Sequence, residues 1–332
     1  MRVAIALFLG MSAAGGSWAQ TASLAGPVEG FTFDAPTRSL RALMGYPGAS
    51  SFGPPLVNGV DAAAVAPQRN YAVAFQNGRC VFISGLDSNA LATPLSGIAL
   101  QPEEIVWSAN GSLAILYSRS AGWFQAVTGF PQSPSAQARV DVTRLGGLLA
   151  SIAADPKGQR IAVGISGAQG GVYWTSDRQA FQPVAAVSNP IALAFSTDGG
   201  TLYVLDGGTQ QVISAGINTA GSLTYALGLA DPVTMRAVAA GSSGDLLYVA
   251  GRSDQLLRVL NPATRQVVED IPLAFRPGRL DPLGADSFVL SARTGNSTPL
   301  WLFSRVPVSG AFFVPAIPAA SSGGALGVGG TQ

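Results

Sequence analysis

The chain has 332 residues, of which 19 are basic, 18 are acidic and none is histidine. Charged residues are only 11% of the chain and Lys157 is the single lysine, so basic clusters that could collect phosphates are missing, which argues against nucleic acid or an anionic membrane as the main partner. The absence of histidine excludes Ser-His-Asp and Cys-His catalysis, histidine-ligated zinc or iron, and covalent haem attachment.

Residues 1–19 have the pattern of a secretory signal peptide. Arg2 is the only charge before an apolar run from Val3 to Met11, and small residues follow as far as Ser17. This apolar run is too short to span a bilayer, and the small residues before Gln20 are typical of a cleavage site. No cysteine follows that point closely enough to carry a lipid anchor, and no later apolar run approaches the roughly 20 residues of a membrane span. We expect an exported protein, either secreted or periplasmic.

Residues 20–58 form a lead into the repeats that follow. Two short strands are predicted there, Phe31–Phe33 and Ser39–Leu43, and the Pro- and Gly-rich stretch Tyr46–Val57 reads as a link. A closed ring of sheets must join its first and last members. We therefore expect the two strands to close the ring by completing the last sheet, or else to form part of a seventh sheet.

Residues 59–317 contain six copies of one pattern. An apolar strand is followed by a turn with Asp, Asn, Pro or Gly and then by a second apolar strand, as in Ile152–Val163 and Leu193–Val204. Two more strands follow in each copy. The first apolar residues after the six turns are Tyr71, Leu113, Ile161, Leu202, Leu247 and Phe288. Their spacings of 41 to 48 residues suit a four-stranded propeller blade of roughly 40–45 residues. The sequence predicts an all-β propeller of six blades, with seven as the alternative, and a flexible Gly-, Ala- and Ser-rich tail over residues 318–332.

Two of the copies carry a family resemblance. Leu247–Ile271 resembles the YVTN-type repeat of secreted propellers, and Phe195–Val204 resembles the broader WD-repeat and NHL class. Asn261 stands where the family usually has aspartate, and no blade ends in Trp-Asp. The resemblance implies the propeller fold and an extracytoplasmic setting. Such propellers are mostly binding or structural modules with diverse partners, so the resemblance implies little about activity.

Few residues offer catalytic chemistry. The carboxylate pairs are Glu103–Glu104, Glu269–Asp270 and Asp281/Asp286. The first two pairs are sequence neighbours, whose side chains point to opposite faces of an extended chain and cannot flank one bond. Cys80 stands alone in an apolar strand, where a buried hydrophobe is expected. We predict no catalytic residue, no metal site and no cofactor.

The connections between the second and third strands of the blades hold a notable share of the few charges. In a propeller these connections emerge on the same face. They contain Arg79, Arg119, Asp206, Arg252, Asp254 and Arg293. Together these residues could form a shallow polar rim for an anionic or sugar-like ligand. The alternative is that loops at strand ends simply hold whatever charges a protein has.

These observations favour a non-enzymatic extracytoplasmic propeller, expected to be a monomer, that binds or scaffolds a protein or carbohydrate partner. The rival hypothesis is a hydrolase or lyase with a carboxylate- or Arg/Tyr-based site at the central channel. An axial pocket with converging carboxylates, arginines and tyrosine would favour the enzyme, whereas an apolar or glycine-lined channel would favour the binding module.

Overall fold

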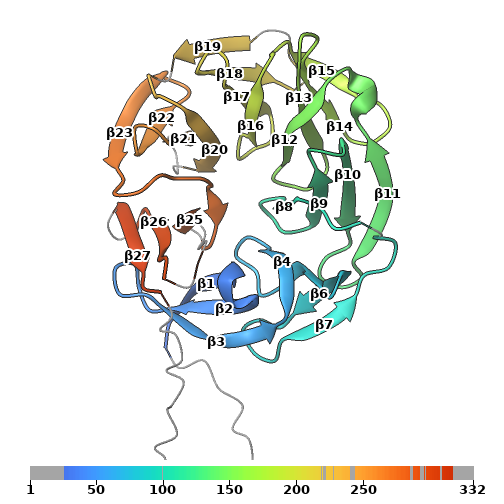
Figure 1. The fold of residues 1–332 in the computed structure, drawn as a ribbon. Helices are drawn as coiled ribbons and strands as arrows, with labels where there is room; N and C mark the ends of the chain where they lie inside the picture. The colour runs from blue at the N-terminus through green and yellow to red at the C-terminus, as the bar shows by residue number, and fades with distance from the viewer. Residues whose placement is uncertain are drawn as a thin grey trace, which may run out of the picture.

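A computed structural model of the chain describes residues 26–316, apart from 99, 218, 220–221, 227, 240–243, 285–286, 292–294, 296 and 307–308. Seven antiparallel sheets stand around one axis and are numbered here as blades one to seven in chain order (Figure 1). The all-β propeller is confirmed, and the number of blades is seven, the alternative to the favoured six. The expected signal peptide (1–19) and tail (318–332) lie outside the described residues. No helix among the residues described is long and apolar enough to cross a membrane.

Each blade is an antiparallel meander that starts at the axis and ends at the periphery. The innermost strands are β1 (Val28–Asp34), β4 (Val60–Val65), β8 (Glu104–Trp107), β12 (Leu148–Ala154), β16 (Pro190–Phe195), β20 (Pro232–Ala239) and β24 (Asp281–Pro282). The second strands are β2 (Ser39–Met44), β5 (Ala72–Gln76), β9 (Leu113–Ser118), β13 (Ile161–Ser166), β17 (Thr201–Asp206), β21 (Asp245–Gly251) and β25 (Ser287–Ser291). The third strands are β3 (Ser51–Asn58), β6 (Arg79–Ser84), β10 (Trp123–Thr128), β14 (Gly171–Thr175), β18 (Gln211–Gly216), β22 (Leu256–Asn261) and β26 (Leu300–Ser304). The outer strands are β7 (Leu91–Pro94), β11 (Ser135–Asp141), β15 (Gln182–Ala185), β19 (Ser222–Ala226), β23 (Gln266–Pro272) and β27 (Gly310–Val314). Two short 3-10 helices, η1 (Ala35–Thr37) and η2 (Thr143–Leu145), complete the described elements.

Blade one is a sheet of its own, with three strands among the residues described. The stretch expected to be a link contains β3, although Pro54 and Pro55 lie within it. Proline lacks the N–H that a ladder needs, but an edge strand tolerates it because one side of that strand has no partner. Blade seven already has four strands, so the N-terminal strands do not complete it. They form a separate sheet, blade one, which brings the number of blades to seven.

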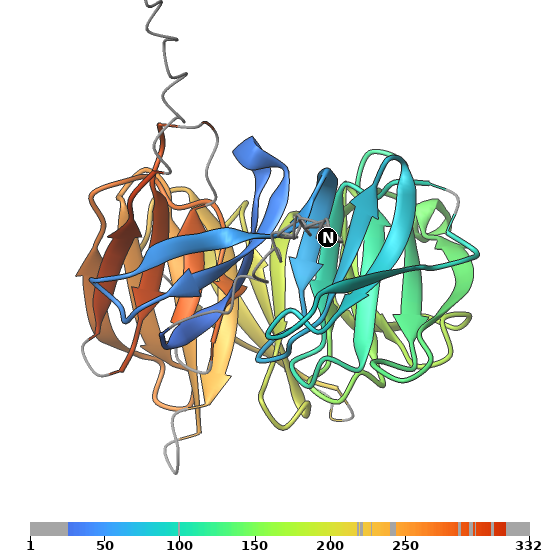
Figure 2. The ribbon, with the colours of Figure 1, turned by 90° about the horizontal axis from the view of Figure 1, so that it is seen from below.

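The ring closes by face-to-face packing of blades one and seven, which lie side by side in Figure 2. Leu43 of β2 packs in one buried cluster with Leu283, Leu302 and Val314 of blade seven. Gly30 of β1 lies so close that a Cβ atom there would stand 2.6 Å from the carbonyl oxygen of Leu283. Apolar contact and a close backbone approach therefore join the two ends of the ring.

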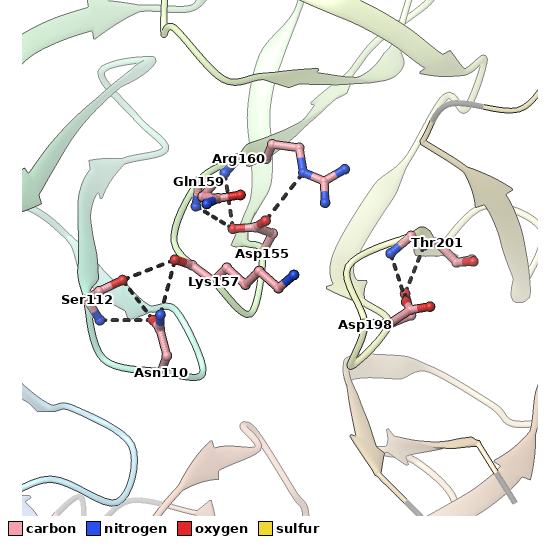
Figure 3. Close-up of polar contacts among 10 residues, drawn as sticks. Asn110, Ser112, Asp155, Lys157, Gln159, Arg160, Asp198 and Thr201 are labelled. Carbon is pink, nitrogen blue, oxygen red and sulfur yellow. Dashed lines mark hydrogen bonds and ion pairs between the residues drawn. The ribbon is translucent and has the colours of Figure 1, made fainter.

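The turn of the sequence repeat, between the first and second strands, connects neighbouring blades. In blade three, the Asn110 side-chain amide donates to the Lys157 carbonyl of blade four at 3.1 Å, and the Ser112 hydroxyl donates to the same oxygen at 3.2 Å (Figure 3). The Tyr71 hydroxyl of blade two donates to the Gly111 carbonyl at 3.1 Å. A Cβ atom at Gly158, whose φ is +71°, would stand 2.5 Å from the Ser112 hydroxyl. The repeated turn is thus a structural joint, which explains why its residues recur.

Candidate functional site

A channel of about 1060 Å³ runs along the propeller axis between the innermost strands. Its walls carry small and aliphatic side chains, such as Ala64, Ala153, Ala194 and Val106. The innermost strands all run in the same direction, so the start of each lies on the same face as the turn between its second and third strands. This face is called the mouth, and charged side chains gather around the channel opening there.

Blade three contributes a hydrogen-bonded cluster to the mouth. Glu104 begins β8 and lies opposite Tyr117 of β9 in the sheet register. The Tyr117 hydroxyl donates to Glu104 Oε2 at 2.6 Å, and Arg119 Nη2 ion-pairs with Glu104 Oε1 at 2.7 Å. Burial, and next the charge of Glu104, raise the pKa of Tyr117 well above its usual range. Both Glu104 oxygens are engaged, and Tyr117 is held as a neutral donor.

Glu103, unlike Glu104, makes its hydrogen bonds to the turn between β9 and β10. Its carboxylate accepts hydrogen bonds from the Ser118 hydroxyl at 2.8 Å, the Arg119 backbone N–H at 3.0 Å and the Ser120 backbone N–H at 3.2 Å. The hydroxyls of Ser120 and then Ser118 lower the pKa of Glu103. Glu103 therefore fixes the turn between β9 and β10, which in turn positions Arg119. The expectation that the two carboxylates do not act on one bond agrees with this geometry.

Blades six and seven contribute arginines and one carboxylate on another side of the channel. Arg279 precedes β24 and ion-pairs with Asp281. The charge of Asp281 raises the pKa of Arg279, and Glu104 and Tyr117 act on it more weakly in the same direction. Arg236 lies in the middle of β20 and also lines the channel. Charges from blades three, six and seven therefore meet around one axial space.

Comparison with known proteins identifies the fold. No family model matches the chain, and no curated protein matches it. A functionally unknown protein from Desulfotomaculum acetoxidans is similar over 87% of this chain and 99% of its own, with a TM-score of 0.59 and 12% identity. A chain from the structure of BBS1N in complex with ARL6DN is similar over 90% of this chain and 95% of its own, with a TM-score of 0.50 and 13% identity. These likenesses show a β-propeller fold.

Two of the six residues predicted for the rim line this channel. Arg119 and Arg252 are exposed and belong to the mouth. Asp254, in the same turn as Arg252, is exposed as well, but its carboxylate accepts a hydrogen bond from the Ala230 backbone N–H at 2.6 Å. The structure therefore brings together Arg119 and Arg252, from blades three and six, with Asp254 beside the second of them.

Asp206 and Arg79, two of the other predicted rim residues, do not line the channel. Asp206 is buried, and it accepts hydrogen bonds from the Gly208 N–H at 2.9 Å and the Thr209 hydroxyl at 2.7 Å within its own turn. Arg79 is exposed at the start of β6 and is absent from the channel lining. Arg293 lies outside the described residues. Asp206 thus serves the fold of its own turn.

Sequence reasoning missed three lining residues. Tyr117 and Arg236 lie within strands β9 and β20, where apolar neighbours surround a polar side chain, and Arg279 lies in the connection between blades six and seven. The sequence holds one signal for Arg236, because this residue interrupts an otherwise apolar run from Met235 to Ala239.

The channel combines features of both rival hypotheses. Its walls carry aliphatic side chains, as expected for a binding module, yet acidic, basic and tyrosine side chains surround its mouth, as the catalytic hypothesis requires. At the mouth, Glu104 is held by Tyr117 and Arg119, and Asp281 is held by Arg279. These contacts fix the position of both carboxylates and of their arginine partners.

Cys80 lies apart from this site. Cys80 is buried in the core between blades two and three, and burial raises the pKa of its thiol to about 12. A thiol in that state is a poor nucleophile. Within the described part of the chain, no three His, Cys, Asp or Glu side chains are grouped so that they could hold a metal ion.

Proposed function

We propose that this protein is a non-enzymatic, extracytoplasmic propeller that binds or scaffolds a protein or carbohydrate partner at the mouth of its axial channel. One observation carries the proposal: exposed charged side chains from different blades, Arg119 and Arg252, gather at one opening of a rigid ring. Preordered side chains lose little conformational entropy on binding, and guanidinium groups suit carboxylate and hydroxyl partners. BBS1N, whose structure with ARL6DN contains a similar fold, is an example of a propeller found in a complex.

Partner capture from the native envelope fraction tests this proposal. The tagged protein is compared with Arg119→Ala plus Arg252→Ala, and bound proteins and glycans are identified by mass spectrometry. The Arg119 ion pair with Glu104 is half-exposed and such pairs contribute little to stability, so the double variant should fold. Arg139→Ala is the matched control, because Arg139 packs over Trp123 and is absent from the channel lining. We expect capture to be lost only in the double variant, and unchanged capture would remove the mouth from consideration.

The catalytic alternative has one observation in its favour, the contact between Tyr117 and Glu104 at the channel. A hydrolase or lyase working there would depend on that phenol as a proton donor or nucleophile. The purified protein should be screened with chromogenic glycosides, esters and polyuronides, in parallel with Tyr117→Phe. The binding proposal expects no turnover by either protein. Turnover that disappears in Tyr117→Phe would establish the enzyme instead.

The proposed setting rests on the sequence. Residues 1–19 support export from the cytoplasm, and we propose that the exported protein is a monomer. Cell fractionation of the tagged full chain, with N-terminal sequencing of the exported product, tests the first point. We expect an N-terminus at Gln20, and size-exclusion chromatography with light scattering should report a monomer.

A further inference from the structure

Arg236 occupies an unusual place in the channel wall. In the register of blade six, Arg236 lies opposite Tyr248, whose side chain belongs to the core between blades six and seven. Its guanidinium carbon lies 5.7 Å from the centre of the Phe288 ring of blade seven. The arginine is partly exposed, and its exposed part faces the channel. A cation is thus built into an apolar wall and supported by an aromatic ring.

Arg236 has no counter-ion of its own. Asp281 is the one carboxylate that acts on it, and Asp281 is already ion-paired with Arg279. In the part of the chain that the structure describes, no group accepts a hydrogen bond from Arg236 or forms an ion pair with it. Glu104 pairs with Arg119, and Glu103 caps a turn. The guanidinium of Arg236 therefore shares its nearest carboxylate with Arg279.

The channel also offers apolar contacts for a ligand. Its lining includes Val233 and Ala237 of the same strand as Arg236, and Leu280 of blade seven. A partly buried guanidinium group without its own counter-ion loses part of its hydration, and no ion pair compensates for this free-energy cost. A monovalent anion with a short apolar body would supply both missing contacts.

We propose that the axial channel binds a small monocarboxylate, whose carboxylate pairs with Arg236 and whose apolar body lies against Val233, Ala237 and Leu280. The planar guanidinium presents two parallel N–H groups that match a carboxylate. This site lies inside the channel and goes beyond partner binding at the mouth.

Calorimetric titration of the purified full chain tests the site without any partner present. The probe is butyrate, and the comparison compounds are butyramide, which has the same shape without the charge, and inorganic phosphate. Arg236→Gln and Asp281→Asn are titrated beside the wild type. Arg139→Gln is the matched control, because Arg139 also packs over an aromatic ring, at 5.9 Å from Trp123, but outside the channel lining. Circular dichroism checks the fold of each variant.

The expected results have opposite signs in the two channel variants. Loss of the charge-assisted contact in Arg236→Gln should weaken butyrate binding about tenfold or more. Asp281→Asn should tighten butyrate binding, because the competing carboxylate is gone. Tighter binding cannot come from a loss of structure, so this variant tests the proposal even if Arg236→Gln does not fold. Arg139→Gln should bind like the wild type. No butyrate binding by the wild type, equal binding of butyramide or phosphate, or weaker binding by Asp281→Asn would each overturn the proposal.

Discussion

Asp155 in the blade-four turn offers a quantitative test of the view that the repeated turns hold the ring together. Its carboxylate is fully buried, and Oδ1 accepts hydrogen bonds from the backbone N–H groups of Gln159 at 2.6 Å and Arg160 at 3.1 Å. Oδ2 accepts from Arg160 Nε at 3.3 Å (Figure 3). Asp155→Ala removes all three hydrogen bonds and leaves their part-buried donors without partners. A loss of about 2–4 kcal/mol in the free energy of unfolding is expected, since each such donor costs about 1–3 kcal/mol and the costs overlap.

Urea unfolding followed by tryptophan fluorescence measures this loss. A domain of this size should show a fall in Tm of about 4–8 °C for the same change. Asp177→Ala is the matched control, because Asp177 also accepts hydrogen bonds from two backbone N–H groups, those of Gln179 and Ala180, both at 2.9 Å, but is exposed. Water can replace its contacts, so the control should lose much less stability. Equal losses in the two variants, or no loss in Asp155→Ala, would refute the argument that burial of the turn carboxylate decides the effect.

Three further predictions concern buried polar groups. Burial raises the pKa of Glu29, offset only in part by the hydroxyls of Ser50 and Ser287, so the folded state favours the protonated acid. The free energy of unfolding of the wild type should therefore rise as pH falls through the raised pKa. Glu29→Gln should be more stable than the wild type at neutral pH but not at low pH. A difference in free energy of unfolding between the two proteins that stays constant across pH in urea unfolding would contradict this. The buried Cys80 thiol should react with Ellman's reagent only after denaturant is added, and rapid labelling of the native protein would be inconsistent with its burial. The buried Tyr225 hydroxyl meets no hydrogen-bond partner among the described residues, so Tyr225→Phe should leave the free energy of unfolding unchanged or raise it by up to about 1 kcal/mol; a clear loss in urea unfolding would show that the hydroxyl has a partner.

The propeller could be predicted from the sequence because the turn that repeats in its blades is recorded locally. The turn residues Asn110, Asp155 and Asp198 hydrogen-bond within their own hairpins, so a single stretch of about ten residues records the pattern. The number of blades, seven, could not be predicted in the same way. Blade one does not carry the repeated turn pattern in its sequence, and the two prolines in its edge strand β3 are typical of a link rather than a strand.

The site was less predictable because its residues meet only in the closed ring. Arg119 and Arg252 could be placed on one face from topology, since the turns that hold them share one strand position. Arg236 and Asp281 come from different blades, so their proximity cannot be predicted from the sequence, whereas the ion pair of Asp281 with Arg279 is local, two residues apart. Asp206 shows the opposite error, because a charge in a predicted mouth turn is buried there to fix the backbone. A charged residue near a strand end can therefore be assigned to a face of the propeller from the sequence. Only the fold shows whether its side chain is free to bind a ligand or instead caps backbone groups of its own turn.

The central claim, that a partner engages the mouth of the axial channel, is tested most directly by site-specific photo-crosslinking in the native envelope. A photoreactive residue replaces Ser253, which is exposed in the mouth turn beside Arg252, and in a second protein it replaces Gln266, which is exposed on the outer strand β23. The account predicts a partner crosslinked from position 253 and none from position 266. Crosslinking from position 266 without any from position 253 would contradict it and assign recognition to the periphery of the ring.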